Sequence, residues 1–350
     1  MRILLLAVLC GWAGQAQTGT KAWNTQAAAD YLDGRMDWWA DWPNAARDHG
    51  TFCVSCHTSM PYALGRPALR GALGEKGPSA SERRFVDNIA KRVSMWNDVL
   101  PFYNEKSGPT KAVESRNTEA VLDALVLARY RAPGTADALR HMWALQLKDG
   151  EKRGSWVWLN FHNEPWEADD SAFWGASLAG LAAGLAPEET RKDAQENIAL
   201  LAGYLQREEA GQSTLHRAVA LWAAGKLPEL LKPENRQAIV AEIVSKQRAD
   251  GGWTESTLVI KDWKRRDGTP MDSESDGYAT GLMVLALQHS GLPAGEAAAA
   301  KGVAWLEQHQ DPGGAWLATS LNKKRDPASD AGRFMSDAAT AYSVMALTGR

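Results

Sequence analysis

Cysteine is scarce in this sequence, and long hydrophobic runs and an excess of charge of one sign are missing. The 350 residues include three cysteines, none of them after position 56, which excludes a framework of several disulfides. The net charge of -3 comes without a basic face, so nucleic acid is not an expected partner. The apolar run from Ile3 to Leu9 is too short to cross a membrane as a helix, so we expect contact with a membrane to be peripheral at most.

Phenylalanine and β-branched runs are also scarce, whereas tryptophan, alanine and glycine are abundant. Sixteen tryptophans stand against six phenylalanines. This composition favours closely packed helices with wide aromatic rings between them over a β-sheet. The chain is long enough for one large core or for two ordinary domains.

The N-terminus has the pattern of a short secretory signal peptide. Met1 and Arg2 precede the apolar run, and small and polar residues follow up to Gln17. We expect a signal peptide over residues 1–16, with cleavage after Ala16. Cys10 would be removed with it, because Leu9 stands where a lipoprotein has a small residue. The expected location is therefore the bacterial periplasm or another site of export.

The strongest local signal is Cys53-Val54-Ser55-Cys56-His57, which has the Cys-x-x-Cys-His spacing of c-type haem attachment. In such a motif the thiols add across the porphyrin vinyl groups and the imidazole ligates the iron. A zinc site would need two more ligands at matching spacing, and a redox dithiol would follow a strand in a βαβ pattern. We therefore expect one covalently attached haem c, held by Cys53 and Cys56, with His57 as the proximal iron ligand.

Helical segments recur in pairs along the chain, and one member of each pair is charged on one face while the other is almost uncharged. The expected helices are 24–36, a segment that begins at the haem motif, 81–100, 120–132, 135–147, 170–185, 187–207, 213–226, 233–248, 275–290, 294–310 and 336–348. Pro61 and Pro67 are expected to bend or end the second helix, and Ser81 to cap the third.

Six exposed helices that alternate with six buried ones predict an all-α fold, an (α/α)6 toroid of six helical hairpins. An open solenoid of helical hairpins is the alternative that the same repeat allows. Residues 17–80 would carry the haem motif and form the first pair, and residues 81–350 would complete the same domain.

The junctions between pairs resemble the glutamine-tryptophan motif of squalene-hopene cyclases and prenyltransferase-type toroids. The matching stretches are Trp305-Leu306-Glu307-Gln308 with Gly314-Ala315-Trp316, Gln247 with Gly251-Gly252-Trp253, and Trp143-Ala144-Leu145-Gln146 with Gly154-Ser155-Trp156. The resemblance implies that these residues tie adjacent outer helices together. The chain also resembles a group of exported bacterial proteins that combine such repeats with an early Cys-x-x-Cys-His motif.

The same resemblance implies a place for a catalytic acid. Cyclases of this family protonate a polyprene with an Asp-x-Asp-Asp element, and Glu167-Ala168-Asp169-Asp170 stands at the comparable position. Asp169 would be the acid, and Glu167 replaces the first aspartate of the family pattern. The alternative is that Asp169 and Asp170 cap the following helix, as Asp276 and Asp337 would do at equivalent helix starts.

In a closed ring the haem would project into the central cavity near its mouth. The fourth buried helix lies opposite the first, so His216 is the leading candidate for the distal iron ligand and His162 is the second. Met271 and Met335 are possible thioether ligands at the same end. Two long loops there, 254–274 and 317–335, carry basic residues that could pair with haem propionates or dock an acidic redox partner. These are Lys261, Lys264, Arg265, Arg266, Lys323, Lys324, Arg325 and Arg333.

Three functions are compatible with these patterns. The first is electron transfer by a monohaem cytochrome, whose partner is another redox protein. The second is a haem-dependent oxidoreductase or sensor that binds an apolar small molecule or gas. The third is a terpenoid cyclase with Asp169 as its acid. We favour the first on the sequence, and the electron donor and acceptor are not specified by it.

Overall fold

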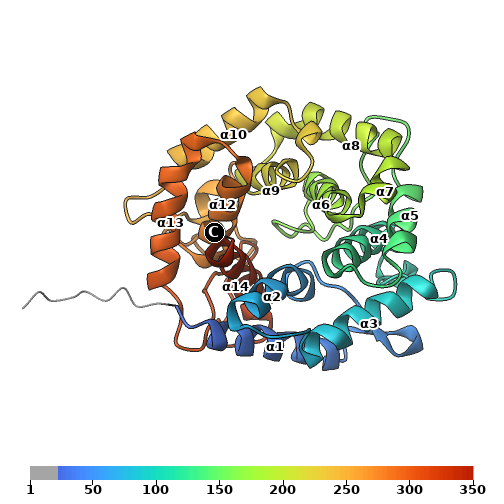
Figure 1. Ribbon diagram of the computed structural model, residues 1–350. Helices are drawn as coiled ribbons and strands as arrows, with labels where there is room; N and C mark the ends of the chain where they lie inside the picture. The colour runs from blue at the N-terminus through green and yellow to red at the C-terminus, as the bar shows by residue number, and fades with distance from the viewer. Residues whose placement is uncertain (1–22, 350) are drawn as a thin grey trace, which may run out of the picture.

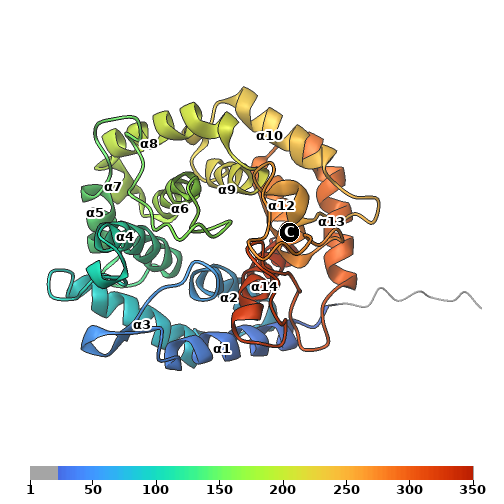
Figure 2. The same ribbon diagram turned by 180° about the vertical axis from the view of Figure 1, so that it is seen from behind.

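The computed structural model describes residues 23–349, and within them twelve helices of ten or more residues form two concentric rings (Figures 1 and 2). The inner ring consists of α2 (Ser59–Leu73), α4 (Lys111–Tyr130), α6 (Ser171–Leu185), α9 (Thr214–Ala224), α12 (Gly277–Ser290) and α14 (Phe334–Thr348). The outer ring consists of α1 (Thr25–Asp41), α3 (Ala80–Ser94), α5 (Thr135–Ala144), α8 (Gln195–Glu208), α10 (Pro233–Ser245) and α13 (Glu296–Gln308). Two short helices, α7 (Glu188–Lys192) and α11 (Glu255–Leu258), and two paired strands, β1 (Ala46–Arg47) and β2 (Thr51–Phe52), lie in the connections.

The ring is closed. The last inner helix, α14, packs against both α12 and the first inner helix, α2. In the outer layer, Gln310 exchanges hydrogen bonds with the backbone of Asn24 at the start of α1, at 2.6 and 3.0 Å. The predicted (α/α)6 toroid is thereby confirmed, and the open solenoid is excluded.

The inner helices are buried on all sides because they are made of small and apolar residues. In α6 every residue from Ser171 to Ala183 is buried. Glycine allows particularly close contact at the closing interface, where a Cβ on Gly65 of α2 would lie 2.9 Å from the Ala341 carbonyl oxygen of α14. The outer helices instead bury one face and expose charged side chains on the other.

The glutamine-tryptophan junctions are built alike at three positions. In each one the tryptophan indole N–H donates to a carbonyl of the preceding outer helix, and the glutamine amide donates to the glycine carbonyl of the turn and to the next outer helix. The pairs are Gln146 with Trp156, Gln247 with Trp253, and Gln310 with Trp316. The resemblance in the sequence pointed to Gln308 at the third junction. The structure uses Gln310 instead, because Gln310 lies in the turn after α13.

Three local predictions near the haem motif need correction. The motif lies in the loop before α2, which begins at Ser59. Pro61 stands in the first turn of α2, where a missing N–H is tolerated. Pro67 lies in the interior of α2, and the helix nevertheless continues to Leu73 because α2 is held by its packing against α14 and α4. Ser79 caps α3 in place of Ser81, in a reciprocal capping box with Glu82.

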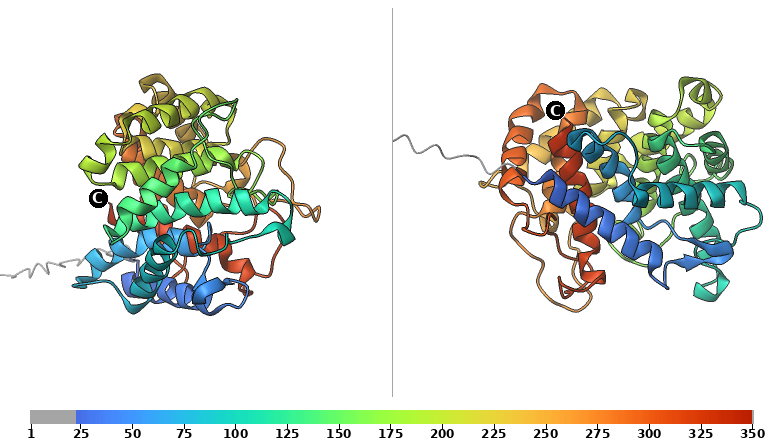
Figure 3. Two further views of the ribbon diagram at one scale, coloured as in Figure 1. Left: turned by 90° about the vertical axis from the view of Figure 1, so that its right-hand side faces the viewer. Right: turned by 60° about the horizontal axis from the view of Figure 1, so that its bottom comes forward.

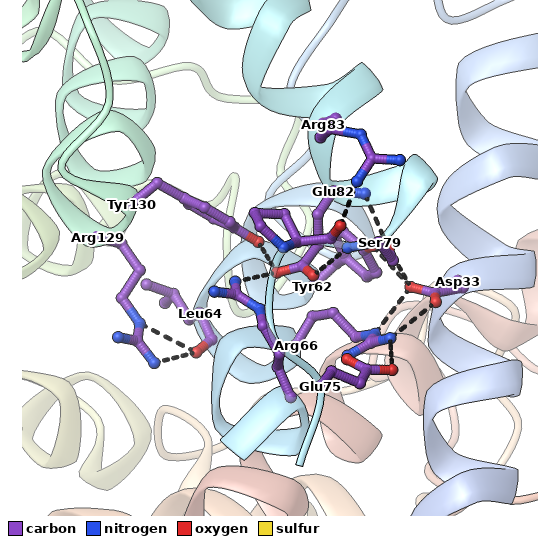
Figure 4. A network of polar contacts seen from close by, with 12 residues as sticks. Asp33, Tyr62, Leu64, Arg66, Glu75, Ser79, Glu82, Arg83, Arg129 and Tyr130 are labelled. Atoms are coloured by element: carbon purple, nitrogen blue, oxygen red, sulfur yellow. Dashed lines mark hydrogen bonds and ion pairs between the residues drawn. The ribbon is translucent and has the colours of Figure 1, made fainter. Parts of the chain in front are cut away.

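Buried ion pairs join the first two hairpins (Figure 4). Arg66 of α2 is 2% exposed and lies between Asp33 of α1 and Glu75, at 3.0 and 2.7 Å. Glu82 of α3, which has no exposed surface, accepts from Arg70 of α2 and from the Tyr130 hydroxyl at the end of α4. The segment that carries the haem motif is therefore part of the ring through contacts on both sides.

Among residues 23–349, the helices are too short or too polar for any of them to cross a membrane. The expected signal peptide, residues 1–16 with Cys10, lies outside the described residues.

Candidate functional site

The inner helices begin at one end of the ring, where three long connections meet. Figure 3 shows the loops on this side, including those that precede α12 and α14. Asn322 joins the three connections: its amide group pairs with the backbone of Glu164 at 2.7 and 2.9 Å, and its carbonyl accepts from the Arg266 N–H at 2.9 Å. The loops thus form one cover over the helix starts.

The haem motif is held beneath this cover by a turn that caps α2. The Ser55 hydroxyl oxygen accepts from the backbone N–H groups of Thr58 and Ser59, at 3.1 and 2.9 Å. The Trp39 indole donates to the Cys53 carbonyl at 2.7 Å. Cys53 and Cys56 are both buried and free. Burial raises the pKa of Cys53 to about 11 and that of Cys56 well above its usual range, so both thiols are neutral.

The His57 ring is fixed in one tautomer by a chain of hydrogen bonds. The Thr58 hydroxyl donates its single proton to Asp337 Oδ2 at 2.7 Å, so its oxygen must accept from His57 Nδ1 at 2.8 Å. Burial, together with the positive charges of Arg35 and Arg325, lowers the pKa of His57 to about 3. The ring is therefore neutral, with a proton on Nδ1 and a free lone pair on Nε2.

Asp337 is the anchor of this chain. It is 1% exposed, it pairs with Arg35 of α1 through two bonds of 2.8 and 3.0 Å, and it accepts from the Tyr31 hydroxyl at 2.8 Å. The sequence predicted that Asp337 caps a helix. Instead it lies inside α14, and its carboxylate ties α1, α14 and the Cys53–His57 segment together because its partners Arg35, Tyr31 and Thr58 come from these parts of the chain.

His57 faces a cavity of about 140 Å³ under the loop cover. The cavity is lined by His57, Asn163, Glu164, Trp166, Glu167, Ser320, Asn322, Arg325, Ala331, Phe334 and Met335. The Phe334 ring stacks on the imidazole with 3.7 Å between centroids, and the rings of Trp39 and Trp166 lie 5.1 and 5.8 Å from it. One imidazole nitrogen therefore opens onto a space whose wall combines the Trp166 and Phe334 rings with polar and charged side chains.

The acidic side chains of the segment before α6 lie in different surroundings, one in the cavity wall and another at the surface. Glu167 lies in the cavity wall, and burial raises its pKa to about 7. The Asp169 side chain is 79% exposed, beside His162 and Asn160. A strong carboxylic acid needs a poorly solvated site, so Asp169 has the wrong surroundings for the role that the cyclase resemblance implies. Asp170 precedes α6 without a capping bond from its side chain, whereas Asp276 does cap α12, with Ala279 N–H as the donor.

The two histidines expected as distal ligands are outside this wall. His216 is fully buried in the first turn of α9, where its Nε2 lies 2.7 Å from the Pro165 carbonyl oxygen and its Nδ1 lies 3.4 Å from Asp170 Oδ2. The His162 side chain is 72% exposed and pairs with Asp169 at 3.0 Å. Met335 shares the cavity wall with His57, whereas Met271 lines a different pocket.

Of the basic residues in the two loops, Arg325 lines the cavity. Arg265 is buried and is used within the loops, where it donates to the Ser320 and Pro270 carbonyls and pairs with Asp272. Thr58 and Asp337 were missed as site residues by sequence reasoning. Thr58 adjoins the motif, but Asp337 is 280 positions away, and no local pattern connects the two.

The donor set fits a c-type haem, although its space is only partly formed. Two neutral buried thiols and an imidazole with a bare Nε2 are the groups that covalent attachment and iron ligation require. The cavity is smaller than the roughly 300 Å³ of a usual cofactor pocket. The Phe334 and Trp166 rings, which pack on His57, occupy part of the space that a macrocycle would need.

Comparison with known proteins agrees with the fold. The squalene-hopene cyclase C-terminal domain matches residues 217–330, less than half of the chain. A polysaccharide lyase aligns with a TM-score of 0.53 at 12% identity, covering 93% of this chain and 97% of the lyase. The GH76A alpha-1,6-mannanase from Salegentibacter sp. HEL1_6 aligns with a TM-score of 0.52 at 11% identity, covering 92% and 100%.

The type II terpene cyclase MstE from Scytonema aligns with a TM-score of 0.48 at 12% identity, covering 93% of this chain and 99% of the cyclase. No curated protein matches the sequence. At such low identity the structural matches speak for the fold alone. The class that emerges is a terpene-cyclase-like α/α toroid, and the activity has to be argued from the site.

Proposed function

We propose that this toroid is an exported monohaem c-type cytochrome that transfers electrons. The observation that carries the proposal is His57. It follows the two cysteines at the required spacing, and its Nε2 is held free of protons in the wall of a cavity that the Trp166 and Phe334 rings line together with polar side chains. When bound, the haem supplies a one-electron iron couple.

Each residue of the site has a defined task in this proposal. Cys53 and Cys56 hold the porphyrin through thioether bonds, and His57 provides the proximal nitrogen. The Thr58–Asp337 chain keeps the His57 ring in the ligating tautomer and orients it, as outer hydrogen-bond partners do at other metal sites. The Trp39, Trp166 and Phe334 rings around His57 would supply the apolar part of the haem surroundings.

The residues that line the cavity beside His57 also suggest a distal iron ligand and a partner for the haem propionates. Met335 is our candidate for the sixth ligand because it lines the cavity with His57. Arg325, in the same wall, is our candidate for pairing with a haem propionate. The remaining exposed basic residues of the two loops would dock an acidic redox partner protein.

The first experiment is expression with c-type maturation machinery, followed by intact-mass and visible spectroscopy. We expect a mass increase of one haem and a six-coordinate low-spin spectrum. Cys53→Ser combined with Cys56→Ser should abolish covalent haem, whereas Val54→Ala, a buried change inside the motif that keeps every donor, should retain it. Absence of covalent haem from the wild type would refute the proposal.

The distal ligand is tested by the spin state of two variants. Met335→Ala is expected to turn the iron high-spin, while His216→Ala leaves it low-spin. The reverse pattern would restore His216 to the distal position that its place opposite the haem motif predicts.

A second candidate function, a haem-dependent oxidoreductase or gas sensor, is favoured by Glu167. A carboxyl with a pKa of about 7 in the wall that His57 shares is suited to hold or deliver a proton beside a ligand. This function predicts a high-spin wild-type iron that binds carbon monoxide, with a binding rate that changes in Glu167→Gln. A low-spin iron that does not bind carbon monoxide would exclude it.

A further inference from the structure

A second group of side chains with metal-ligating atoms lies next to the cavity. Glu164 and Asp170 come from the connection before α6, and His216 comes from the first turn of α9. One ligand atom from each of the three lies within 4.8 Å of the others. His216 has no exposed surface and Glu164 is 2% exposed, so two of the three side chains are shielded from bulk water.

In this group, three atoms that can accept a hydrogen bond have no donor within the described residues. A carbonyl oxygen only accepts, so His216 Nε2, 2.7 Å from the Pro165 carbonyl, must carry a proton. In the neutral ring Nδ1 then has a lone pair, and it faces Asp170 Oδ2. Among the described residues, no partner donates to His216 Nδ1, Asp170 Oδ2 or Glu164 Oε2. Unsatisfied acceptors at such depth are costly, so either a bound cation or a second proton on His216 is needed to satisfy them.

The spacing fits a metal ion better than a hydrogen bond. His216 Nδ1 and Asp170 Oδ2 are 3.4 Å apart, which is long for a hydrogen bond. A tetrahedral ion with bonds of about 2.1 Å separates its ligands by about 3.4 Å. Glu164 adds a third ligand atom, which lies within 4.8 Å of the other two. Two carboxylates also supply the charge that a dication neutralises.

We propose that Glu164, Asp170 and His216 bind a divalent transition-metal ion, with Zn²⁺ as the best match to one imidazole and two carboxylates. The ion would fasten two parts of the chain to each other: α9, and the connection before α6 in which Glu167 lies. Because Glu164 also lines the cavity beside His57, the site would set the position of one cavity wall. His216 would then be committed through both ring nitrogens and unavailable to a haem iron.

The competing occupant is a proton. Burial lowers the pKa of His216, but the Asp170 and Glu164 carboxylates and the Pro165 carbonyl raise it further than burial lowers it. An imidazolium between the two carboxylates would also satisfy the acceptors. The two occupants differ in a measurable way, since a bound ion adds a metal and removes the proton from Nδ1.

The test is metal content and Zn²⁺ titration of the full chain. We expect one zinc per chain after dialysis against metal-free buffer, and a dissociation constant that rises more than about 100-fold in Glu164→Gln and in His216→Gln. His162→Ala is the matched control, because it removes a histidine from an exposed His–Asp pair and should leave zinc binding unchanged. Cys53→Ser with Cys56→Ser should also retain the zinc, which separates this site from zinc held by the haem motif.

Co²⁺ substitution of the wild type gives a readout that needs no variant. A tetrahedral site with nitrogen and oxygen ligands gives intense visible absorption bands, and these are expected at one equivalent. A wild type that binds neither Zn²⁺ nor Co²⁺ at pH 7.5, with His216 doubly protonated by ¹⁵N NMR, would overturn the proposal in favour of the buried proton. Zinc that is lost with the two cysteines would overturn it equally.

Discussion

Closure of the ring predicts a large penalty for adding one methyl group at Gly314. This glycine has φ of +93° and lies in the turn after α13, against the first turn of α1. A Cβ on it would lie 2.1 Å from the Ala27 carbonyl oxygen. In Gly314→Ala the two outer helices at the closing junction must therefore move apart.

The size of the effect follows from what this movement breaks. The left-handed φ costs an alanine about 1–2 kcal/mol. Separation of α1 from the turn removes the two Asn24–Gln310 hydrogen bonds, at about 1 kcal/mol each, and loosens the Trp23–Trp316 ring contact, at about 1 kcal/mol. We expect the free energy of unfolding to fall by about 4–5 kcal/mol.

Gly150→Ala is the matched control. Gly150 has φ of +77° in the corresponding turn after α5, but no atom lies within 4 Å of its added Cβ. Its substitution should lower the free energy of unfolding by about 1–2 kcal/mol, from the backbone alone. Urea denaturation followed by circular dichroism measures both variants. Equal losses would show that the closing contact does not hold the ring together, and would refute the reasoning.

Three further predictions concern groups inside the ring. Thr58→Val removes the acceptor for His57 Nδ1 and should shift part of the His57 signal to the other neutral tautomer in ¹⁵N NMR of the haem-free protein, while an unchanged spectrum would exclude the Thr58 link. Glu167 holds a proton in the folded state up to about pH 7 that the unfolded chain releases near pH 4.5, so its contribution to stability falls as pH rises through this range. Glu167→Gln should therefore gain up to about 3 kcal/mol over the wild type at pH 8 but little at pH 4, measured by urea denaturation, and an equal gain at both would contradict the assigned pKa. Arg92→Met leaves the fully buried Glu119 without its 2.6 Å partner and should cost about 3–5 kcal/mol, against less than about 0.5 kcal/mol for Arg140→Ala at the exposed Asp137 pair, and similar losses would contradict the buried-pair argument.

Much of the fold could be read from the sequence because it depends on periodic, local patterns. Alternation of charged and uncharged helices shows which helices face water, and this alternation occurs six times along the described residues. The junction glutamines and tryptophans could be recognised because each one bonds within its own turn before it reaches the next helix. The cysteine and histidine spacing likewise needs only five consecutive residues.

The surroundings of the site could not be read in this way, because they depend on which distant side chains meet. Asp337 looked like another helix cap, yet Arg35 and Thr58 draw it into the interior across the closing junction. Asp169 and Glu167 stand two positions apart, and only the course of the loop places one at the surface and the other in the cavity.

His216 shows the same division between sequence and structure. Its place in the first turn of the fourth buried helix followed from counting helices along the chain. Its neighbours, Asp170 and the Pro165 carbonyl, followed from the way one connection folds over α9. The sequence by itself determined the toroid, since this rests on repeats, and it supplied the Cys-x-x-Cys-His spacing on which the haem proposal depends. The tertiary structure alone decided which partners His57 and His216 have and which carboxylates are buried, because both depend on side chains far away in the chain.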